Sequence, residues 1–214
     1  MNKAKESAYY EQPRPEMLAF LPEKITRSIE FGCSTGLFSK TVKEQKGSEA
    51  WGVDMDEQAI AIAAGRLDRA LAGDVFDIIC QLPENSFDCV ICNDFLEHLA
   101  YPDKFLLNVK RILTPGGSLV CSLPNVRYWK NVRELLFEKD WRYRDAGILD
   151  NTHLRFFTKK SMIRLMVNNG YKVELIKGIN PNNKSLRFII PNLLTLGKHR
   201  DMQYLQFGIR ATLT

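Results

Sequence analysis

A short apolar strand followed by a glycine-containing turn and a helix constrains this chain more than any other feature. The stretch runs Ser28-Ile29-Glu30-Phe31-Gly32-Cys33-Ser34-Thr35-Gly36, and helical spacing then begins at Leu37. Glycine at a strand-to-helix turn leaves the backbone bare, so that a ligand can approach the free N–H groups of the helix start. Ligands of open parallel sheets bind at the carboxyl ends of strands. This turn is therefore the first candidate for a small-molecule site.

Segments with strand-like and helix-like patterns alternate along the rest of the chain. The expected strands cover residues 28–31, 50–54, 70–75, 87–93, 118–123, 171–177 and 204–213, and the expected helices cover 37–45, 57–66, 102–113 and 158–169. The run at 87–93 is almost continuously apolar, which is typical of a central parallel strand buried on both faces. The alternation predicts an α/β fold with a doubly wound, seven-stranded, mostly parallel Rossmann-like sheet.

An N-terminal arm precedes this alternation, and two longer segments interrupt it. We expect residues 1–22 to form the arm, in which Pro13 and Pro15 disfavour helix, and residues 23–214 to form the domain. The inserts at about 124–157 and 181–200 are rich in basic, aromatic and apolar residues. Because the first insert follows a strand end, where substrates bind, we expect the two inserts to form a small substrate cap.

Composition narrows the class of partner. The 214 residues include 30 Lys and Arg against 25 Asp and Glu, a net charge of +5. This charge favours an acidic substrate over a basic one but is too small to indicate nucleic acid. No apolar run approaches the roughly 20 residues that a membrane span requires, and the polar N-terminus lacks the apolar core of a signal peptide. We therefore expect a cytoplasmic protein without a membrane partner.

The motifs, taken together, resemble those of class I S-adenosylmethionine-dependent methyltransferases. In that family an acid precedes a G-x-G-x-G-like turn, as Glu30 does here, although Ser34 replaces the usual middle glycine. Further matches are Asp54, Gly73-Asp74-Val75, Ser86-Phe87-Asp88-Cys89-Val90 and Leu113-Thr114-Pro115-Gly116-Gly117. The resemblance extends from about residue 28 to 214. Within the family, the segments Leu123-Pro124-Asn125-Val126-Arg127 and Asp150-Asn151-Thr152-His153-Leu154-Arg155-Phe156-Phe157-Thr158 resemble methyltransferases of types 11 and 12 that accompany polysaccharide glycosyltransferases.

The resemblance implies S-adenosylmethionine as the cofactor and S-adenosylhomocysteine as its product. Glu30 would help to hold the amino acid part with its ammonium group, Asp54 the ribose hydroxyls and Asp74 the adenine amino group. The residues expected to bind the cofactor are Glu30, Gly32, Cys33, Ser34, Thr35, Gly36, Asp54, Met55, Asp74, Val75, Asn93, Asp94 and Phe95. A dehydrogenase is the rival interpretation of Asp54, but its fingerprint requires G-x-G-x-x-G, and Glu30 would repel a pyrophosphate.

A second group, Asp94-Phe95-Leu96-Glu97-His98, resembles a divalent-metal-binding E-x-x-E-H segment. Ubiquinone-biosynthesis O-methyltransferases and small-RNA 2′-O-methyltransferases carry that segment, and the latter add a later histidine, to which His153 is comparable. In other members without metal the histidine is structural or a general base. Asp in place of the first Glu shortens the reach, so we assign no metal ligands here and keep a divalent metal as the less favoured alternative. His98 and His153 are instead the candidate catalytic residues.

The residues favour a small-molecule O-methyltransferase. The basic, aromatic first insert suggests an acidic acceptor that bears a phosphate, a carboxylate or a nucleotide. The resemblance to methyltransferases that accompany polysaccharide glycosyltransferases implies a sugar or a sugar nucleotide. One alternative is an RNA or tRNA methyltransferase, and another is a pseudoenzyme that binds the cofactor without turnover. The apolar segment 188–196 is expected either to cover the substrate or to form a homodimer contact.

Overall fold

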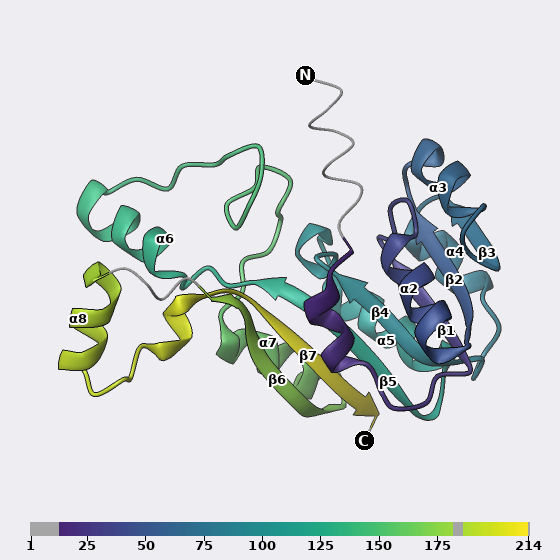
Figure 1. Cartoon of the computed structure of the whole chain (residues 1–214). Helices are drawn as coiled ribbons and strands as arrows, with labels where there is room; N and C mark the ends of the chain where they lie inside the picture. The colour runs from purple at the N-terminus through teal and green to yellow at the C-terminus, as the bar shows by residue number, and fades with distance from the viewer. Residues whose placement is uncertain (1–12, 182–185, 214) are drawn as a thin grey trace.

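Seven strands form one sheet in the order β3-β2-β1-β4-β5-β7-β6, and β7 runs in the direction opposite to the other six (Figure 1). The computed structural model describes residues 13–181 and 186–213. The strands are β1 Arg27–Phe31, β2 Glu49–Asp54, β3 Arg69–Ala72, β4 Phe87–Asn93, β5 Leu113–Pro124, β6 Tyr171–Pro181 and β7 Tyr204–Leu213. The strand order reverses between β1 and β4, so the crevice at their carboxyl ends is where a ligand is expected. The predicted doubly wound α/β fold is confirmed.

Helices cover both faces of the sheet. They are η1 Pro15–Phe20, α2 Leu37–Lys46, α3 Glu57–Ala63, α4 Val75–Gln81, η2 Leu96–His98, α5 Pro102–Ile112, α6 Trp129–Arg133, η3 Glu134–Glu138, α7 Lys159–Asn168, α8 Leu186–Leu194 and η4 Arg200–Gln203. Thr158 caps α7, because its side chain accepts the N–H of Ser161 in a capping box.

Alternate residues of β4 separate the two layers of the core. Val90 and Cys92 pack in the cluster that contains the buried faces of α4, α5 and α7. Cys89 and Ile91 pack in a second cluster with η1 and α2. Successive side chains of a strand point to opposite faces, so one almost continuously apolar strand serves both layers.

The described part of the N-terminal arm is packed on the sheet. Pro13 and Pro15 were expected to disfavour helix, but Pro15 begins the 3-10 helix η1, where its missing N–H is not needed. Met17 and Phe20 are buried, and the Phe20 ring lies over Gly208 of β7, where an added Cβ would come within 2.4 Å of it. Residues 1–12 of the predicted arm lie outside the described residues.

Several element boundaries differ from the prediction. The third strand ends at Ala72 rather than at Val75, because Asp74 accepts the N–H of Phe76 and starts α4. The strand expected at 118–123 extends over Leu113–Pro124. The strand expected at 171–177 continues to Pro181, since both strands pair with β7 along their length.

The two inserts leave the sheet at the same edge. β5 and β6 both end opposite residues 204–206 of β7, and α6 and α8 lie beyond that end of the sheet in Figure 1. Residues 182–185 of the second insert are not among the described residues. Within the part of the chain that is described, no helix has the length and apolar character needed to cross a membrane.

Candidate functional site

The glycine turn after β1 has the backbone conformation that its residues suggest. Gly32 and Gly36 have φ angles of 73° and 74°, in the left-handed region that glycine tolerates. A Cβ on Gly32 would lie 2.8 Å from the Phe95 ring, so glycine is also required for space. Ser34, which stands where related turns carry glycine, has a φ angle of 49°. The turn therefore keeps its shape with one residue in a conformation that costs free energy.

Glu30 is buried and lines a cavity at this turn. Its carboxylate accepts a 2.6 Å hydrogen bond from Ser39 Oγ and a 3.3 Å hydrogen bond from Asn93 Nδ2. Burial raises the pKa of Glu30 to about 7, although both hydrogen bonds and the charge of Arg14 oppose the rise. Asn93 Oδ1 is buried and has no hydrogen-bond partner among the described residues. Two acceptors side by side suit a ligand that brings N–H donors and positive charge.

Asp54 stands at the carboxyl end of β2, next to the turn. Its two oxygens accept the backbone N–H groups of Ser34 and Asp56, at 2.7 and 3.0 Å. Each carboxylate oxygen has a second lone pair, so the group can still accept two hydroxyls of a ligand. The geometry thus places an acceptor where a ribose of a nucleoside ligand is expected in an open α/β sheet.

A first cavity of about 610 Å³ joins these groups. Of the residues predicted to bind a cofactor, those that line it are Glu30, Gly32, Cys33, Ser34, Asp54, Met55, Asp74, Val75, Asn93, Asp94 and Phe95. Thr35 and Gly36 do not line it. Thr35 instead accepts from Arg66 through its carbonyl and hydroxyl oxygens, and Gly36 packs against Ala63 and Leu67. The cavity volume fits a small organic ligand.

A second cavity, of about 510 Å³, adjoins the first. The residues that line both are Arg14, Asp94 and His98. The first insert contributes Pro124, Ala146, Gly147, Ile148, Asp150 and His153 to the second cavity. A ligand in one cavity therefore meets a ligand in the other beside these three shared residues.

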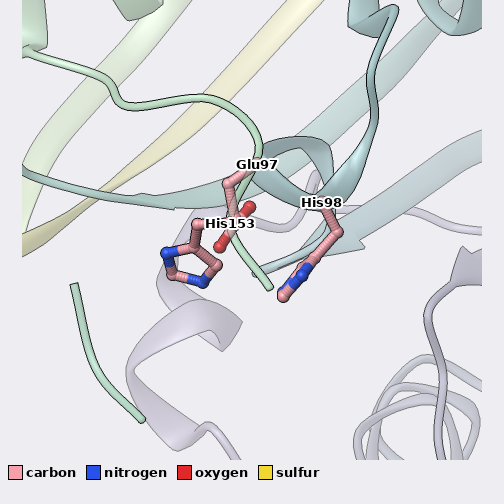
Figure 2. Close-up of side chains that lie close together, drawn as sticks. All are labelled: Glu97, His98 and His153. Carbon is pink, nitrogen blue, oxygen red and sulfur yellow. The ribbon is translucent and has the colours of Figure 1, made fainter. Parts of the chain in front are cut away.

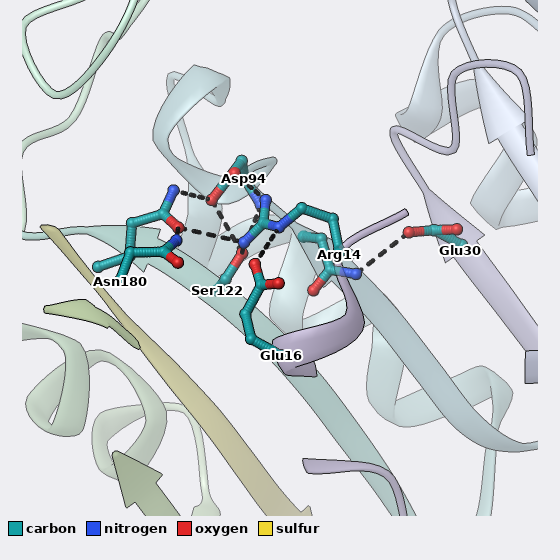
Figure 3. A network of polar contacts seen from close by, with 8 residues as sticks. Arg14, Glu16, Glu30, Asp94, Ser122 and Asn180 are labelled. Atoms are coloured by element: carbon teal, nitrogen blue, oxygen red, sulfur yellow. Dashed lines mark hydrogen bonds and ion pairs between the residues drawn. The ribbon is translucent and has the colours of Figure 1, made fainter. Parts of the chain in front are cut away.

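Arg14 lies at the boundary between the two cavities. Figure 3 shows that it pairs with Asp94 and Glu16 and that a terminal nitrogen donates to Ser122 Oγ. The same nitrogen also donates to Gln206 Oε1. Asp94, with a φ angle of 48°, also accepts from Ser122 and Gln206. The network joins η1 to the ends of β4, β5 and β7. No local pattern near Arg14 points to Asp94, since 80 positions separate them.

Glu97, His98 and His153 form a compact cluster beside the second cavity. One ligand atom from each lies within 4.8 Å of the others, and Figure 2 shows the side chains converging. The ring centroids of the two histidines are 4.7 Å apart. Asp94, which the sequence grouped with Glu97 and His98, is engaged with Arg14 instead. Packing of the first insert brings His153 to the cluster, where the N–H groups of Leu154 and Arg155 donate to the Glu97 carbonyl oxygen.

The charges and tautomers of the cluster follow from its surroundings. Both carboxylate oxygens of Glu97 are buried without a partner among the described residues, and burial raises its pKa well above the usual range. His98 Nδ1 lies 3.3 Å from the Thr152 carbonyl oxygen, and His153 Nδ1 lies 3.0 Å from that of Ile148. Because a carbonyl oxygen only accepts, Nδ1 carries the proton in the neutral form of each ring, and that form has its lone pair on Nε2. Burial, with His153 nearby, lowers the pKa of His98.

Comparison with known proteins agrees with this geometry. Residues 4–176 match the family described as Methyltransferase domain. The ubiquinone biosynthesis O-methyltransferase of Idiomarina loihiensis is 33% identical over 110 residues, which cover 47% of this chain and 44% of that protein. The enzyme of the same name from Coxiella burnetii is 28% identical over 121 residues, covering 52% of this chain and 50% of that protein. The chain spans about half the length of the curated relatives it matches.

Solved structures show the same fold. A SAM-dependent methyltransferase from Archaeoglobus fulgidus superimposes with a TM-score of 0.65 at 18% identity, over 98% of this chain and 92% of that one. Another, from Aquifex aeolicus, gives a TM-score of 0.65 at 16% identity over the full length of both chains. With the strand order, the glycine turn and the family match over most of the chain, these findings establish that the chain belongs to the class I S-adenosylmethionine-dependent methyltransferases.

Proposed function

We propose that this protein transfers the methyl group of S-adenosylmethionine to a hydroxyl group of a small acceptor. In this proposal the cofactor occupies the first cavity and the acceptor the second. The observation that carries the proposal is that His98 lines both cavities, at their boundary. A group at this place can contact the acceptor atom that receives the methyl group.

The first cavity fits the cofactor residue by residue. Glu30 and the unpartnered Asn93 Oδ1 suit the ammonium group of its amino acid part. Asp54, at the turn, is proposed to accept the ribose hydroxyls, and Asp74 to accept the adenine amino group. Gly32 keeps free the space that a Cβ would take beside Phe95. We retain Thr35 and Gly36 as residues that shape the turn rather than as contacts.

Methyl transfer depends more on the position of the acceptor oxygen than on general acid–base catalysis. The cofactor supplies a methyl carbon on a positively charged sulfur, so the S–C bond breaks as the O–C bond forms and the leaving group is neutral. The protein must hold the acceptor oxygen in line with that bond. His98 accepts the hydroxyl proton at Nε2, since its Nδ1 is held by the Thr152 carbonyl oxygen. His153 packs against the His98 ring and orients it.

The lining of the second cavity favours a sugar-type acceptor over an acidic one. Among the described residues that line it, Arg14 is the one Lys or Arg side chain, and it pairs with Glu16 and Asp94. An acidic acceptor would therefore find no unpaired cation there, whereas the carboxylates and imidazoles suit hydroxyl groups. The first insert supplies one wall, which supports its proposed role in a substrate cap together with the second insert.

A divalent metal ion is the alternative role for the same cluster. The buried, unpartnered carboxylate of Glu97 and the two Nε2 lone pairs form a His₂Glu donor set, and each histidine gives its other N–H to a carbonyl oxygen. In this role Glu97, His98 and His153 would hold the ion, and the ion would lower the pKa of the acceptor hydroxyl. Chelator dialysis, followed by titration of Mn²⁺ and Zn²⁺ into the protein and into its Glu97→Gln variant, distinguishes the two roles. Metal binding that the variant loses indicates metal ligands, and no metal binding by the parent favours a general base.

Calorimetric titration tests the cofactor part of the proposal. S-Adenosylmethionine and S-adenosylhomocysteine are expected to bind the protein with micromolar affinity and to lose that affinity in Asp54→Ala. An acceptor screen that begins with sugar nucleotides then tests turnover. His98→Ala is expected to keep cofactor binding and lose turnover, while His199→Ala, outside both cavities, is expected to keep both. Failure to bind either form of the cofactor would remove the proposal, and binding without turnover on any acceptor would favour a pseudoenzyme.

A further inference from the structure

The two inserts expose large apolar side chains that the proposed reaction does not use. They include Leu135, Leu136 and Phe137 of η3 in the first insert, and Ile190, Leu193, Leu194 and Leu196 in and after α8 in the second. We call these seven residues the insert surface. Phe137 and Leu194 are each 79% exposed and Leu196 is 89% exposed. Exposed apolar residues gathered on two segments that both lie beyond the same end of the sheet mark an interaction surface rather than the scattered exposure of an ordinary surface.

The positive charge of the chain is concentrated in the same inserts. Residues 124–157 and 181–200 contain 11 Lys and Arg against 5 Asp and Glu, whereas the rest of the chain contains 19 against 20. Three arginines of the first insert pair with acids of that insert: Arg133 with Glu138, Arg142 with Asp140 and Arg144 with Glu134. The cations Lys130, Lys139, Lys198 and Arg200 are exposed. The apolar residues thus lie on segments whose net charge is positive.

Both inserts leave the sheet at the edge where the cavities lie. They are joined at their bases, because Arg127 Nε donates to Asp201 at 2.7 Å and Asn125 donates to the Asp201 carbonyl oxygen. α6 and α8 extend beyond the sheet on the same side in Figure 1. The first insert also lines the second cavity. A surface that binds the inserts therefore lies next to the proposed acceptor cavity.

We propose that the insert surface docks on the headgroup region of an anionic lipid bilayer. Exposed leucine, isoleucine and phenylalanine side chains enter the boundary between headgroups and acyl chains, and Lys and Arg side chains pair with anionic headgroups. A second copy of the chain fits this surface less well, because the positive inserts of two copies would repel each other. RNA fits less well too, because leucine and isoleucine offer it neither stacking nor hydrogen bonds.

This inference differs from the expectation of no membrane partner. That expectation rested on the absence of a spanning segment, and no described helix can cross a bilayer. A protein that lies on a membrane needs only a short amphipathic surface, which a search for long apolar runs does not detect.

Vesicle co-sedimentation of the full chain tests the proposal. We expect binding to vesicles of phosphatidylcholine with phosphatidylglycerol, little binding to phosphatidylcholine alone, and weaker binding as the salt concentration rises. Leu193→Ser/Leu194→Ser and Phe137→Ser should each reduce the affinity by on the order of tenfold or more. Leu107→Ser is the matched control, because Leu107 is 56% exposed on α5, outside the inserts. A thermal melt of every variant checks that the fold is retained.

Two results would overturn the proposal. One is a lack of binding to the anionic vesicles, or binding that the insert substitutions and Leu107→Ser reduce equally. The other is a dimer in sedimentation equilibrium that Leu193→Ser/Leu194→Ser dissociates, which would assign the insert surface to a second copy. Both results are independent of whether the first cavity binds S-adenosylmethionine.

Discussion

Replacing Glu30 by Gln is expected to stabilise the fold at neutral and basic pH. The pKa of Glu30 rises from its usual 4.5 to about 7 on folding, because its carboxylate is buried. At about 1.4 kcal/mol per pKa unit, keeping Glu30 ionised above pH 7 costs the folded state about 3 kcal/mol. The raised pKa of an acid means that this cost is absent below pH 4.5, grows between pH 4.5 and 7, and is constant above.

The neutral side-chain amide of the Glu30→Gln variant can keep the hydrogen bonds that the Glu30 carboxylate makes. Asn93 Nδ2 can donate to Gln Oε1 in place of Glu30 Oε1, and the Ser39 hydroxyl, which now donates to Glu30 Oε2, can rotate to accept from Gln Nε2. At pH 8 the free energy of unfolding of Glu30→Gln should therefore exceed that of the parent by at most about 3 kcal/mol. The two free energies should converge as the pH falls towards 4.5.

Urea denaturation at several pH values between 4.5 and 8 measures this difference. Glu49→Gln is the control, because hydrogen bonds from Trp51 and Arg27 lower the pKa of Glu49 and the same substitution should there reduce stability at pH 8. A Glu30→Gln variant that is less stable than the parent at pH 8, or a difference that does not change with pH, would refute the burial argument.

The same substitution should have the opposite effect on cofactor binding. If Glu30 binds the ammonium group, its ionised form is required, so the affinity of the parent for S-adenosylmethionine should rise as the pH increases from 6 to 8 through the Glu30 pKa of about 7. Glu30→Gln should bind more weakly and lose this rise. Calorimetry at constant ionic strength measures both, and an unchanged affinity in the variant would exclude an ammonium contact at Glu30.

Three further substitutions test how the site is held. Gly32→Ala should destabilise the fold by about 1–3 kcal/mol, because of its φ of 73° and the 2.8 Å approach of a Cβ to Phe95, and thermal melts that match the parent would contradict this. Phe20→Ala should cost about 3–5 kcal/mol in urea, since Phe20 fills the space above Gly208; a loss below about 1 kcal/mol would mean that η1 is not part of the core. Arg14→Met should weaken binding of S-adenosylhomocysteine, because Asp94 at the boundary loses its cationic partner, and an affinity equal to the parent's would show that the network is not needed to shape the cavity.

Local patterns determined the sheet and most of the lining of the first cavity. The glycine turn, the acid at Asp54 and the apolar run of β4 each depend on residues close together in the sequence. Parallel strands also bring their carboxyl ends to one edge whatever the details of packing. The expectation that the third strand extends to Val75 was wrong, because an Asp that could end a strand can also cap a helix, and the hydrogen bond from the Phe76 N–H to Asp74 decided between them.

Only the tertiary structure decided which side chains meet at the boundary of the two cavities. Asp94, Glu97 and His98 share a local spacing, yet Asp94 pairs with Arg14 while Glu97 and His98 meet His153. The direction of each side chain depends on partners that the fold brings from distant segments, such as η1 and the first insert. A sequence pattern describes neighbours along the chain, whereas the contacts of a buried polar group are set by whatever packs against it in three dimensions.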